Sequence, residues 1–142
     1  LPVLERRVHD WRRNHDYVVD VIAQSPWISV PDKFPLEQRA PDSLQFNLVG
    51  FSDADTRAFQ DAAAARGVKV QVFGMSTDNA RAFWNWQFLG DLPELPKTRA
   101  MLMRACDTRL PARLTLDQCA LVADAIVAAA EDVMGEVKVY GT

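Results

Sequence analysis

The sequence predicts an α+β fold: a two-layer α/β sandwich in which helices cover a small, mostly antiparallel sheet and a long N-terminal helix precedes it. Two observations support this prediction. Residues 44–74 have the pattern of a strand, a helix and a second strand. Residues 4–22 and 115–134 each place apolar side chains at helical spacing. A strand–helix–strand unit covered by further helices on one face is the centre of such a sandwich.

The first helix is predicted over residues 4–22, where bulky side chains recur every three or four positions. They form one narrow stripe, which consists of Leu4, Val8, Trp11, His15, Val18 and Ile22. The other faces carry arginines interleaved with aspartates, which indicates a solvated surface rather than a phosphate site. The helix ends at Ser25, because the residue before a proline is disfavoured in a helix. We therefore expect residues 1–25 to form a long connecting helix.

His15 lies within this stripe and is the one histidine that invites a functional interpretation. No second histidine, cysteine or carboxylate shares its face at the spacing of metal ligands. His9, six residues earlier, lies on another side of the helix. We therefore interpret His15 as a buried, hydrogen-bonded core residue, and the sequence predicts no metal site.

Residues 26–42 contain four prolines and predict an extended connection with one short edge strand at residues 27–30. The two strands of the central unit follow from alternating apolar residues. These are Leu44, Phe46 and Leu48 in residues 44–51, then Val68, Val70 and Val72 in residues 68–72. Between the strands, Ser52 and Asp55 predict a capping box at the start of a helix. Gly67 supplies the left-handed residue that ends it.

A third strand is predicted over residues 82–89, which are rich in aromatic side chains. Trp84, Trp86 and Phe88 occupy alternate positions and would share one side of that strand. Aromatic rings supply both core layers and the lining of ligand pockets. The three rings are therefore expected to form either a layer of the core or the wall of a ligand pocket.

Pro96 suits the first position of a helix, and this helix is predicted to run to about Asp107. Residues 108–114 then predict a brief strand or an extended connection, because they are partly apolar and interrupted by a proline. Cys106 and Cys119 both fall within predicted helices among apolar neighbours. They are expected to be inert buried thiols rather than redox or nucleophilic groups.

The last helix is predicted to begin at Thr115, which forms a second capping box with Gln118. Its buried stripe consists of Cys119, Val122, Ile126, Ala129 and Val133. Gly135 ends the helix, and residues 136–142 are expected to form a terminal strand or an ordered tail.

The composition excludes several classes of function. The chain of 142 residues has a formal net charge of -3, whereas a general binder of nucleic acid or acidic membranes needs a basic surface. No segment is long and apolar enough to cross a bilayer, and no signal-peptide pattern is present at residue 1. We therefore expect a soluble, cytoplasmic protein with neither nucleic acid nor membrane as partner. The sequence also contains no glycine-rich phosphate loop, paired-cysteine metal signature or nucleophile elbow, so it predicts no catalytic residue.

The order of the elements, together with short motifs, resembles a known family. A long amphipathic helix and a proline-rich crossing precede the strand–helix–strand unit, and three motifs follow it: Leu95-Pro96 at a helix start, Leu110-Pro111, and Leu114-Thr115 at the last helix. This arrangement resembles the C-terminal small domain of the fold-type I, pyridoxal-phosphate-dependent aminotransferases of the DegT/DnrJ/EryC1/StrS group. The resemblance extends from the first helix to about Val133.

The resemblance implies that residues 1–142 are one domain from the C-terminal part of a longer chain, with residues 44–142 as the sandwich core. The chain opens on Leu1 with no methionine, which fits that expectation. The parent enzyme would be a homodimer that uses pyridoxal phosphate to transfer an amino group to the carbonyl of a keto sugar. The missing N-terminal large domain would supply the Schiff-base lysine. This chain alone would be inactive and would bind no cofactor, because its own lysines lack the groups that this chemistry needs: Lys33, Lys69, Lys97 and Lys138.

Four residues are expected to face the substrate in that enzyme. Arg109 and Arg113 would meet an anionic group, while Trp84 and Trp86 would stack on a ring. The alternative for the arginines is surface or interdomain salt bridging. If a large domain is missing, the face it covers should be an apolar patch near the first helix, or the chain should self-associate.

A different class of function remains open alongside the enzyme domain. The chain would then be a freestanding small-ligand-binding or protein-interaction α/β module whose pocket is lined by residues 84–88.

Overall fold

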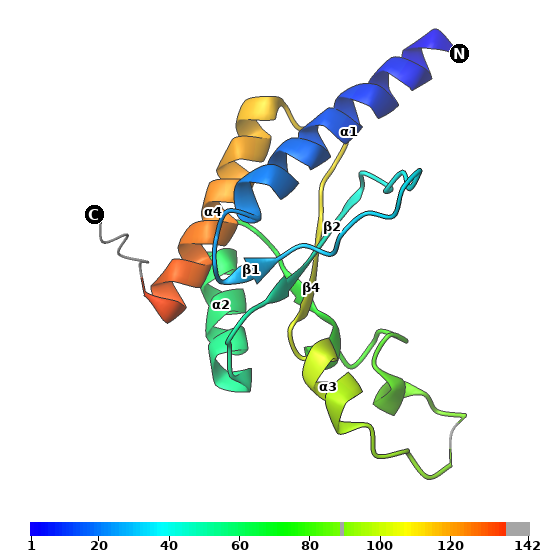
Figure 1. Ribbon diagram of the computed structural model, residues 1–142, viewed down its shortest axis with the longest axis vertical. Helices are drawn as coiled ribbons and strands as arrows, with labels where there is room; N and C mark the ends of the chain where they lie inside the picture. Colours follow the sequence, from blue (N-terminus) through cyan, green and yellow to red (C-terminus); the bar gives the residue numbers. More distant parts are fainter. Residues whose placement is uncertain (89, 136–142) are drawn as a thin grey trace.

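The computed structural model of the chain describes residues 1–88 and 90–135. The fold is α+β, as predicted (Figure 1). The elements in chain order are α1 (Pro2–Ile22), β1 (Ile28–Ser29), β2 (Ser43–Leu48), α2 (Asp53–Ala65), β3 (Gln71–Val72), the 3-10 helices η1 (Phe73–Met75) and η2 (Phe83–Asn85), α3 (Pro96–Leu102), β4 (Ala105–Arg109) and α4 (Leu116–Met134). The terminal strand or tail predicted for residues 136–142 lies outside the described residues.

The sheet has the strand order β1-β2-β4-β3, and every neighbouring pair is antiparallel. Asp107 of β4 lies opposite Gln45 of β2 on one side and opposite Gln71 of β3 on the other. Strands β2 and β3 therefore run parallel to each other with β4 between them. The predicted strand–helix–strand unit is a split β-α-β motif.

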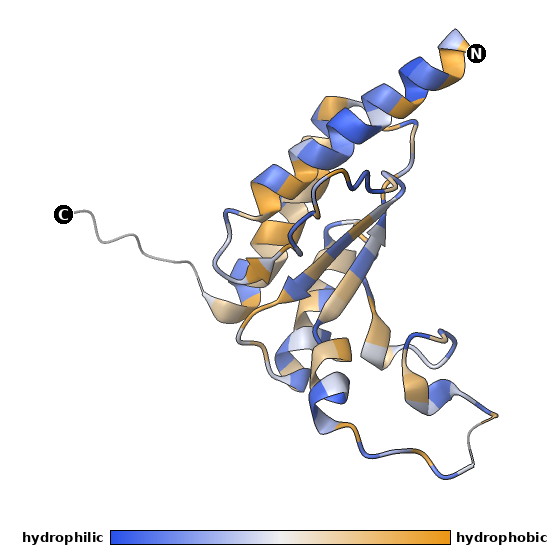
Figure 2. Cartoon of the chain, turned by 45° about the vertical axis from the view of Figure 1, so that its right-hand side comes forward, coloured by the Kyte–Doolittle hydropathy of each residue, from blue (hydrophilic) through white to orange (hydrophobic). Residues whose placement is uncertain are grey.

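The two faces of the sheet differ sharply in polarity. One face is apolar and packs against α1, α2 and α4, which all lie on that side (Figures 1 and 2). Its buried residues are Ile28, Leu44, Phe46, Leu48, Val72 and Cys106. The helices contribute fully buried side chains that include Val18, Ile22, Phe59, Ala63, Cys119 and Ile126. Alternation along each strand puts the polar residues on the opposite face, away from α1, α2 and α4.

Helix α1 follows its predicted stripe, but only its second half is buried. Val18 and Ile22 are inaccessible to solvent, whereas Leu4 is 58% exposed and the first turns extend past the rest of the molecule (Figure 1). The indole Nε1 of Trp11 donates to the carbonyl of Leu110 at 2.6 Å. Helix α1 is therefore anchored from Trp11 onwards. Leu1, Val3 and Leu4 are exposed.

His15 is the core residue that the sequence predicts. It is 4% exposed, and its Nε2 lies 3.3 Å from the carbonyl oxygen of Ser43. The neighbouring Asn14 donates from Nδ2 to the carbonyl of Leu114 at 2.9 Å. These polar contacts connect α1 to the start of β2 and to the segment that precedes α4.

The strand predicted over residues 82–89 is wrong. Residues 83–85 form the 3-10 helix η2, and no described residue of this segment belongs to a strand. Side-chain amides replace the strand hydrogen bonds here. Asn85 donates from Nδ2 to the carbonyls of Ser76 and Asn79 at 2.8 and 2.9 Å. These bonds fold the chain back on itself before it can extend.

The helix predicted from Pro96 to Asp107 is also corrected. It ends at Leu102, and residues 105–109 form β4, a central strand of the sheet. Pairing with two neighbouring strands outweighs the local helical pattern. Cys106 therefore lies on a strand and not in a helix. Both cysteines are buried as expected, and desolvation raises the pKa of both thiols, which disfavours the reactive thiolate.

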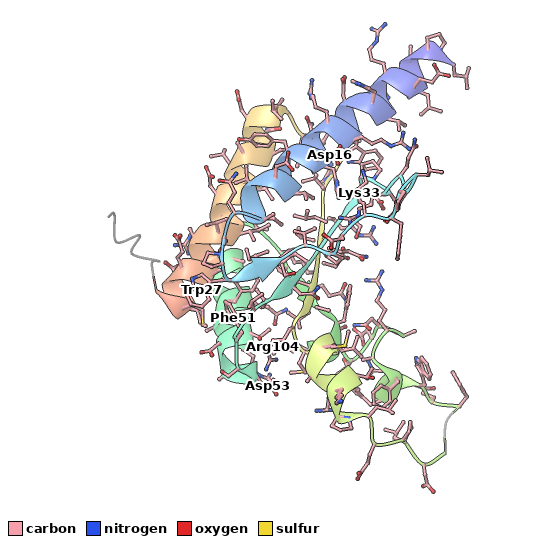
Figure 3. All side chains as sticks on the ribbon, in the orientation of Figure 1. Asp16, Trp27, Lys33, Phe51, Asp53 and Arg104 are labelled. Atoms are coloured by element: carbon pink, nitrogen blue, oxygen red, sulfur yellow. The ribbon has the colours of Figure 1, made fainter. Side chains whose placement is uncertain are left out.

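Both predicted capping boxes are confirmed. Ser52 accepts from the amide of Asp55 while the Asp55 carboxylate accepts from the amide of Ser52, and Thr115 and Gln118 are related in the same way. Arg104 adds a long-range contact at the start of α2, because its Nη1 donates to Asp53 at 2.7 Å (Figure 3). Gly67 has φ +83° directly after α2, as predicted for a left-handed helix end.

The Ser52 cap makes a testable contribution to stability. Its loss in Ser52→Ala is expected to lower the free energy of unfolding by about 1 kcal/mol. Hydrogen bonds from the Ser52 side chain and amide lower the pKa of the Asp55 carboxyl in the folded protein. A depressed folded pKa means that Asp55 stabilises the fold above its unfolded pKa, and that this stability is lost as the pH falls through the folded value.

The contribution of Asp55 is tested by measuring the free energy of unfolding in urea at several pH values between neutral pH and about pH 3. This range includes the pKa of an unfolded aspartate, which is about 3.9. Asp55→Asn is expected to flatten the loss of stability in acid. Asp61→Asn changes an exposed carboxyl on the same helix that makes no cap, and should leave the pH profile unchanged. Equal profiles for wild type and Asp55→Asn would contradict the assignment.

Candidate functional site

The polar face of the sheet is the first candidate site. The strand register places one row of hydrophilic residues on this face, across all four strands. The row consists of Ser29, Ser43, Gln45, Asn47, Gln71, Asp107 and Arg109. We call this surface the polar face.

Asp107 lies at the centre of the polar face and is the unusual residue there. It is only 5% exposed, and its Oδ1 accepts a hydrogen bond from the hydroxyl of Ser43. Within the described residues it forms no ion pair. Burying a carboxylate without a cationic partner is costly, and such a group in a cavity is a candidate for binding or catalysis.

A cavity of about 440 Å³ opens beside Asp107, which is within the size range of small-molecule sites. Its lining combines two cations, two carboxylates, two amides, a hydroxyl and one valine. These residues come from α2, the segment that leads into β3, β3 itself, the loop after η1, and β4. The lining residues are Gln60, Lys69, Val70, Gln71, Ser76, Asp78, Asp107 and Arg109. We call it the Asp107 cavity.

A second candidate lies in the loop between η1 and α3, which projects away from the helices (Figure 1). We call residues 76–88 and 90–95 the aromatic lobe. The ring of Trp84 packs edge-to-face against Phe83 with centroids 5.1 Å apart, and the guanidinium of Arg99 lies 4.7 Å above it. Trp84 and Arg99 line a cavity of about 350 Å³ together with Phe83 and residues 92–96.

The remaining aromatic residues of the lobe point to solvent. Trp86 and Phe88 stack with an interplanar angle of 16° and are 37% and 81% exposed. The indole N–H of Trp86 donates to the carbonyl of Ala80. These two rings are therefore a surface feature and not part of the cavity that Trp84 lines.

A third cavity, of about 510 Å³, lies between α1 and residues 31–45. Two of its charged groups already pair with each other. Arg39 forms an ion pair with Glu37 and donates to the carbonyl of Pro31. A hydrogen bond from the amide of Phe34 lowers the pKa of Glu37. This cavity is therefore the weakest of the three candidates.

The structure does not bring the four predicted substrate-facing residues together. Arg109 lines the Asp107 cavity, Trp84 lines the cavity in the aromatic lobe, and Trp86 and Arg113 are exposed and line neither. Asp107 and Lys69 are not among the site residues that the sequence predicts. Asp107 is not predicted there because it falls at the end of the helix that the sequence predicts from Pro96 to about Asp107. The sequence does carry a signal for strand β4, because Cys106 and Thr108 alternate with the charged residues Asp107 and Arg109.

The Asp107 cavity is not a complete site for pyridoxal phosphate. Lys69 and Asp107 line one cavity, so a lysine and a carboxylate are both present. No residue from the first turn of a helix lines that cavity, although the cofactor's phosphate needs such a cradle of amides. The first turns of α2 and α4 are instead acidic and already capped.

Residues 1–88 and 90–135 contain no group of three or more histidine, cysteine or carboxylate side chains placed to hold a metal ion. Over the same residues, no helix combines the length and apolar character needed to cross a membrane. In comparison with known proteins, the chain matches no protein-family model and no curated sequence.

Proposed function

We propose that this chain is the C-terminal small domain of a pyridoxal-phosphate-dependent aminotransferase of the DegT/DnrJ/EryC1/StrS group, acting on the carbonyl of a keto sugar. A preceding large domain would hold the cofactor, and the two copies of the parent enzyme would form a homodimer. The observation that supports this most is the polar face. Helices α1, α2 and α4 pack against the apolar side of the sheet, and the polar face presents Asp107 and Arg109 beside a cavity.

The positions of the shared motifs also support the proposal. Pro96 is the first residue of α3, Leu110 and Pro111 directly follow β4, and Thr115 caps α4. Each motif thus lies at the boundary of an element, where proline and capping residues have a structural role.

The part played by this chain would be to bind and orient the substrate and to exclude water. Arg109 supplies donors for an anionic group, and Trp84 offers a half-buried ring for stacking. Bound pyridoxal phosphate supplies the electron sink for amino transfer, and the Asp107 cavity provides no complete site for it.

The test compares this chain with the product of its whole reading frame, expressed and purified in parallel. The full product is expected to carry the visible absorbance of bound pyridoxal phosphate and to transfer an amino group from an amino acid to a keto sugar. The chain alone is expected to do neither. A full product that lacks a lysine-bearing domain, or that binds no pyridoxal phosphate, would contradict the proposal.

One observation favours a second function, a freestanding ligand-binding module. The cavity of about 350 Å³ under Arg99 and Trp84 is lined mostly by aromatic, leucine and proline side chains, as small-ligand sites usually are. Under this hypothesis the purified chain binds its ligand without any other domain. A ligand that quenches the tryptophan fluorescence of the wild type, but not of Trp84→Ala, would support the module.

A further inference from the structure

We propose that the Asp107 cavity is a binding site for a small anionic molecule that also carries hydroxyl groups, of the phosphorylated-polyol class. Lys69 and Arg109 hold the anionic group, and Asp107 accepts hydrogen bonds from the hydroxyls. The proposal does not depend on the aminotransferase hypothesis, because this chain itself supplies every group that it uses.

The first step is the position of the two cations. Gln71 lies opposite Asp107 in the antiparallel pair of β3 and β4. Lys69, two residues before the start of β3, and Arg109 on β4 line the same cavity. The hydroxyl of Thr108 donates to the carbonyl of Lys69 at 2.6 Å, which holds this part of the chain against β4. Two cations that line one cavity repel each other, and an anion bound between them would offset that repulsion.

Lys69 and Arg109 both have N–H donors that remain available to bind such an anion. Arg109 uses one nitrogen, Nη1, in its ion pair with Asp42 at 2.9 Å, and a guanidinium has five N–H donors. Lys69 forms no ion pair within the described residues. Both side chains are exposed at the mouth of the cavity. The cationic end of the cavity is thus accessible.

The second step is the acceptor end of the cavity. Asp107 is two residues from Arg109 on the same strand face, roughly 7 Å away. Its Oδ1 is occupied by the Ser43 hydroxyl. Every fully buried side-chain nitrogen or oxygen of the described residues has a hydrogen-bond partner. The other oxygen, Oδ2, has none among the described residues, so it is not fully buried, and Asp107 lines the cavity. A carboxylate repels a second anion and accepts from hydroxyls, and the amide of Gln71 beside it pairs with hydroxyls in both roles.

The ligand that satisfies both ends is anionic at one end and hydroxylated about 7 Å away. A bare anion would contact only the two cations, and a neutral polyol would contact only Asp107. Comparing their binding with that of a molecule that carries both groups therefore tests the proposal. The probe is glycerol 3-phosphate, with inorganic phosphate and glycerol as its two halves. Binding to the full chain is measured by isothermal titration calorimetry at low ionic strength, where exposed charges are least screened.

We expect glycerol 3-phosphate to bind more tightly than phosphate, and glycerol alone to show no binding. Lys69→Gln should weaken glycerol 3-phosphate binding about tenfold or more, the loss expected for one charged hydrogen bond. Asp107→Asn should weaken glycerol 3-phosphate but leave phosphate unchanged or tighter. Lys97→Gln, a matched change at an exposed lysine on α3 outside the cavity, should have no effect.

Three results would overturn the proposal: no binding at millimolar concentration, equal binding of phosphate and glycerol 3-phosphate, or undiminished binding by Lys69→Gln. Because Asp107 is buried, its variant must first be shown to be folded by circular dichroism. Arg109→Gln provides a second test at an exposed position if Asp107→Asn does not fold, and it should weaken binding as Lys69→Gln does. A failure of this test leaves the aminotransferase proposal standing, since that one is decided on the full reading frame.

Discussion

Replacing Phe59 with alanine is expected to lower the free energy of unfolding by about 3–5 kcal/mol. Phe59 is inaccessible to solvent on α2. Its ring packs edge-to-face against Phe46 of β2, with centroids 6.2 Å apart, and against Phe51, with centroids 6.0 Å apart. Truncation removes this three-ring contact between the helix and the sheet and leaves a cavity, because a close-packed core relaxes only in part.

Urea denaturation followed by circular dichroism measures the effect, and the midpoint must shift without a change in slope for the comparison to hold. Phe88→Ala is the matched control. Phe88 is 81% exposed, so its loss should change stability by no more than about 0.5 kcal/mol. Equal stabilities for the two variants would show that the α2–sheet contact is not the centre of the core.

A methyl group at Gly74 is expected to destabilise the fold by about 1–3 kcal/mol, because the site has no room for it. An added Cβ would lie 2.7 Å from the Sδ of Met103, 2.9 Å from the carbonyl carbon of Leu102 and 2.9 Å from the amide nitrogen of Met103. The thioether can move aside, but the backbone at the end of α3 cannot. Gly74 therefore holds η1 close against the turn that leads into β4.

The experiment compares Gly74→Ala with Gly90→Ala by the same urea titration. A Cβ at Gly90 would meet no heavy atom within 4 Å, so that substitution should be close to neutral. Met103→Ala in the Gly74→Ala background should not restore stability, because two of the three close contacts are with backbone atoms. Full rescue by Met103→Ala would show that the side chain alone causes the clash.

The elements that the sequence predicts correctly are those set by interactions between near neighbours. Alternation along β2 and the stripe of α1 require only that one face of each element be apolar. The boxes of Ser52 with Asp55 and of Thr115 with Gln118 span three residues each. Local chemistry of this kind is complete within a few residues, so it can be deduced before the fold is known.

The strand predicted over residues 82–89 and the end of the helix predicted from Pro96 to Asp107 are wrong. In both segments the hydrogen-bond partners are distant in the sequence or do not follow from the spacing of apolar residues. β4 is a strand because β2, about 60 residues earlier, and β3 pair with its two edges, whereas its isolated sequence continues a helical pattern. The segment at Trp84 fails to extend because the Asn85 amide bonds to the carbonyls of Ser76 and Asn79. Neither set of hydrogen-bond partners can be predicted from the periodicity of the apolar residues.

The same distinction applies to the candidate sites. Sequence alone selected Arg109 and Trp84 by residue type, and each lines a cavity. Only the tertiary structure separates them into two places and puts Asp107 and Lys69 in the lining of one cavity, because β3, which follows Lys69, pairs with β4. The sequence by itself determined the fold class, the capped helices and the central strand–helix–strand unit through short-range patterns. The packing of remote segments decided β4, the aromatic lobe and the polar cavity, since a charge acquires its partners only when the chain has folded.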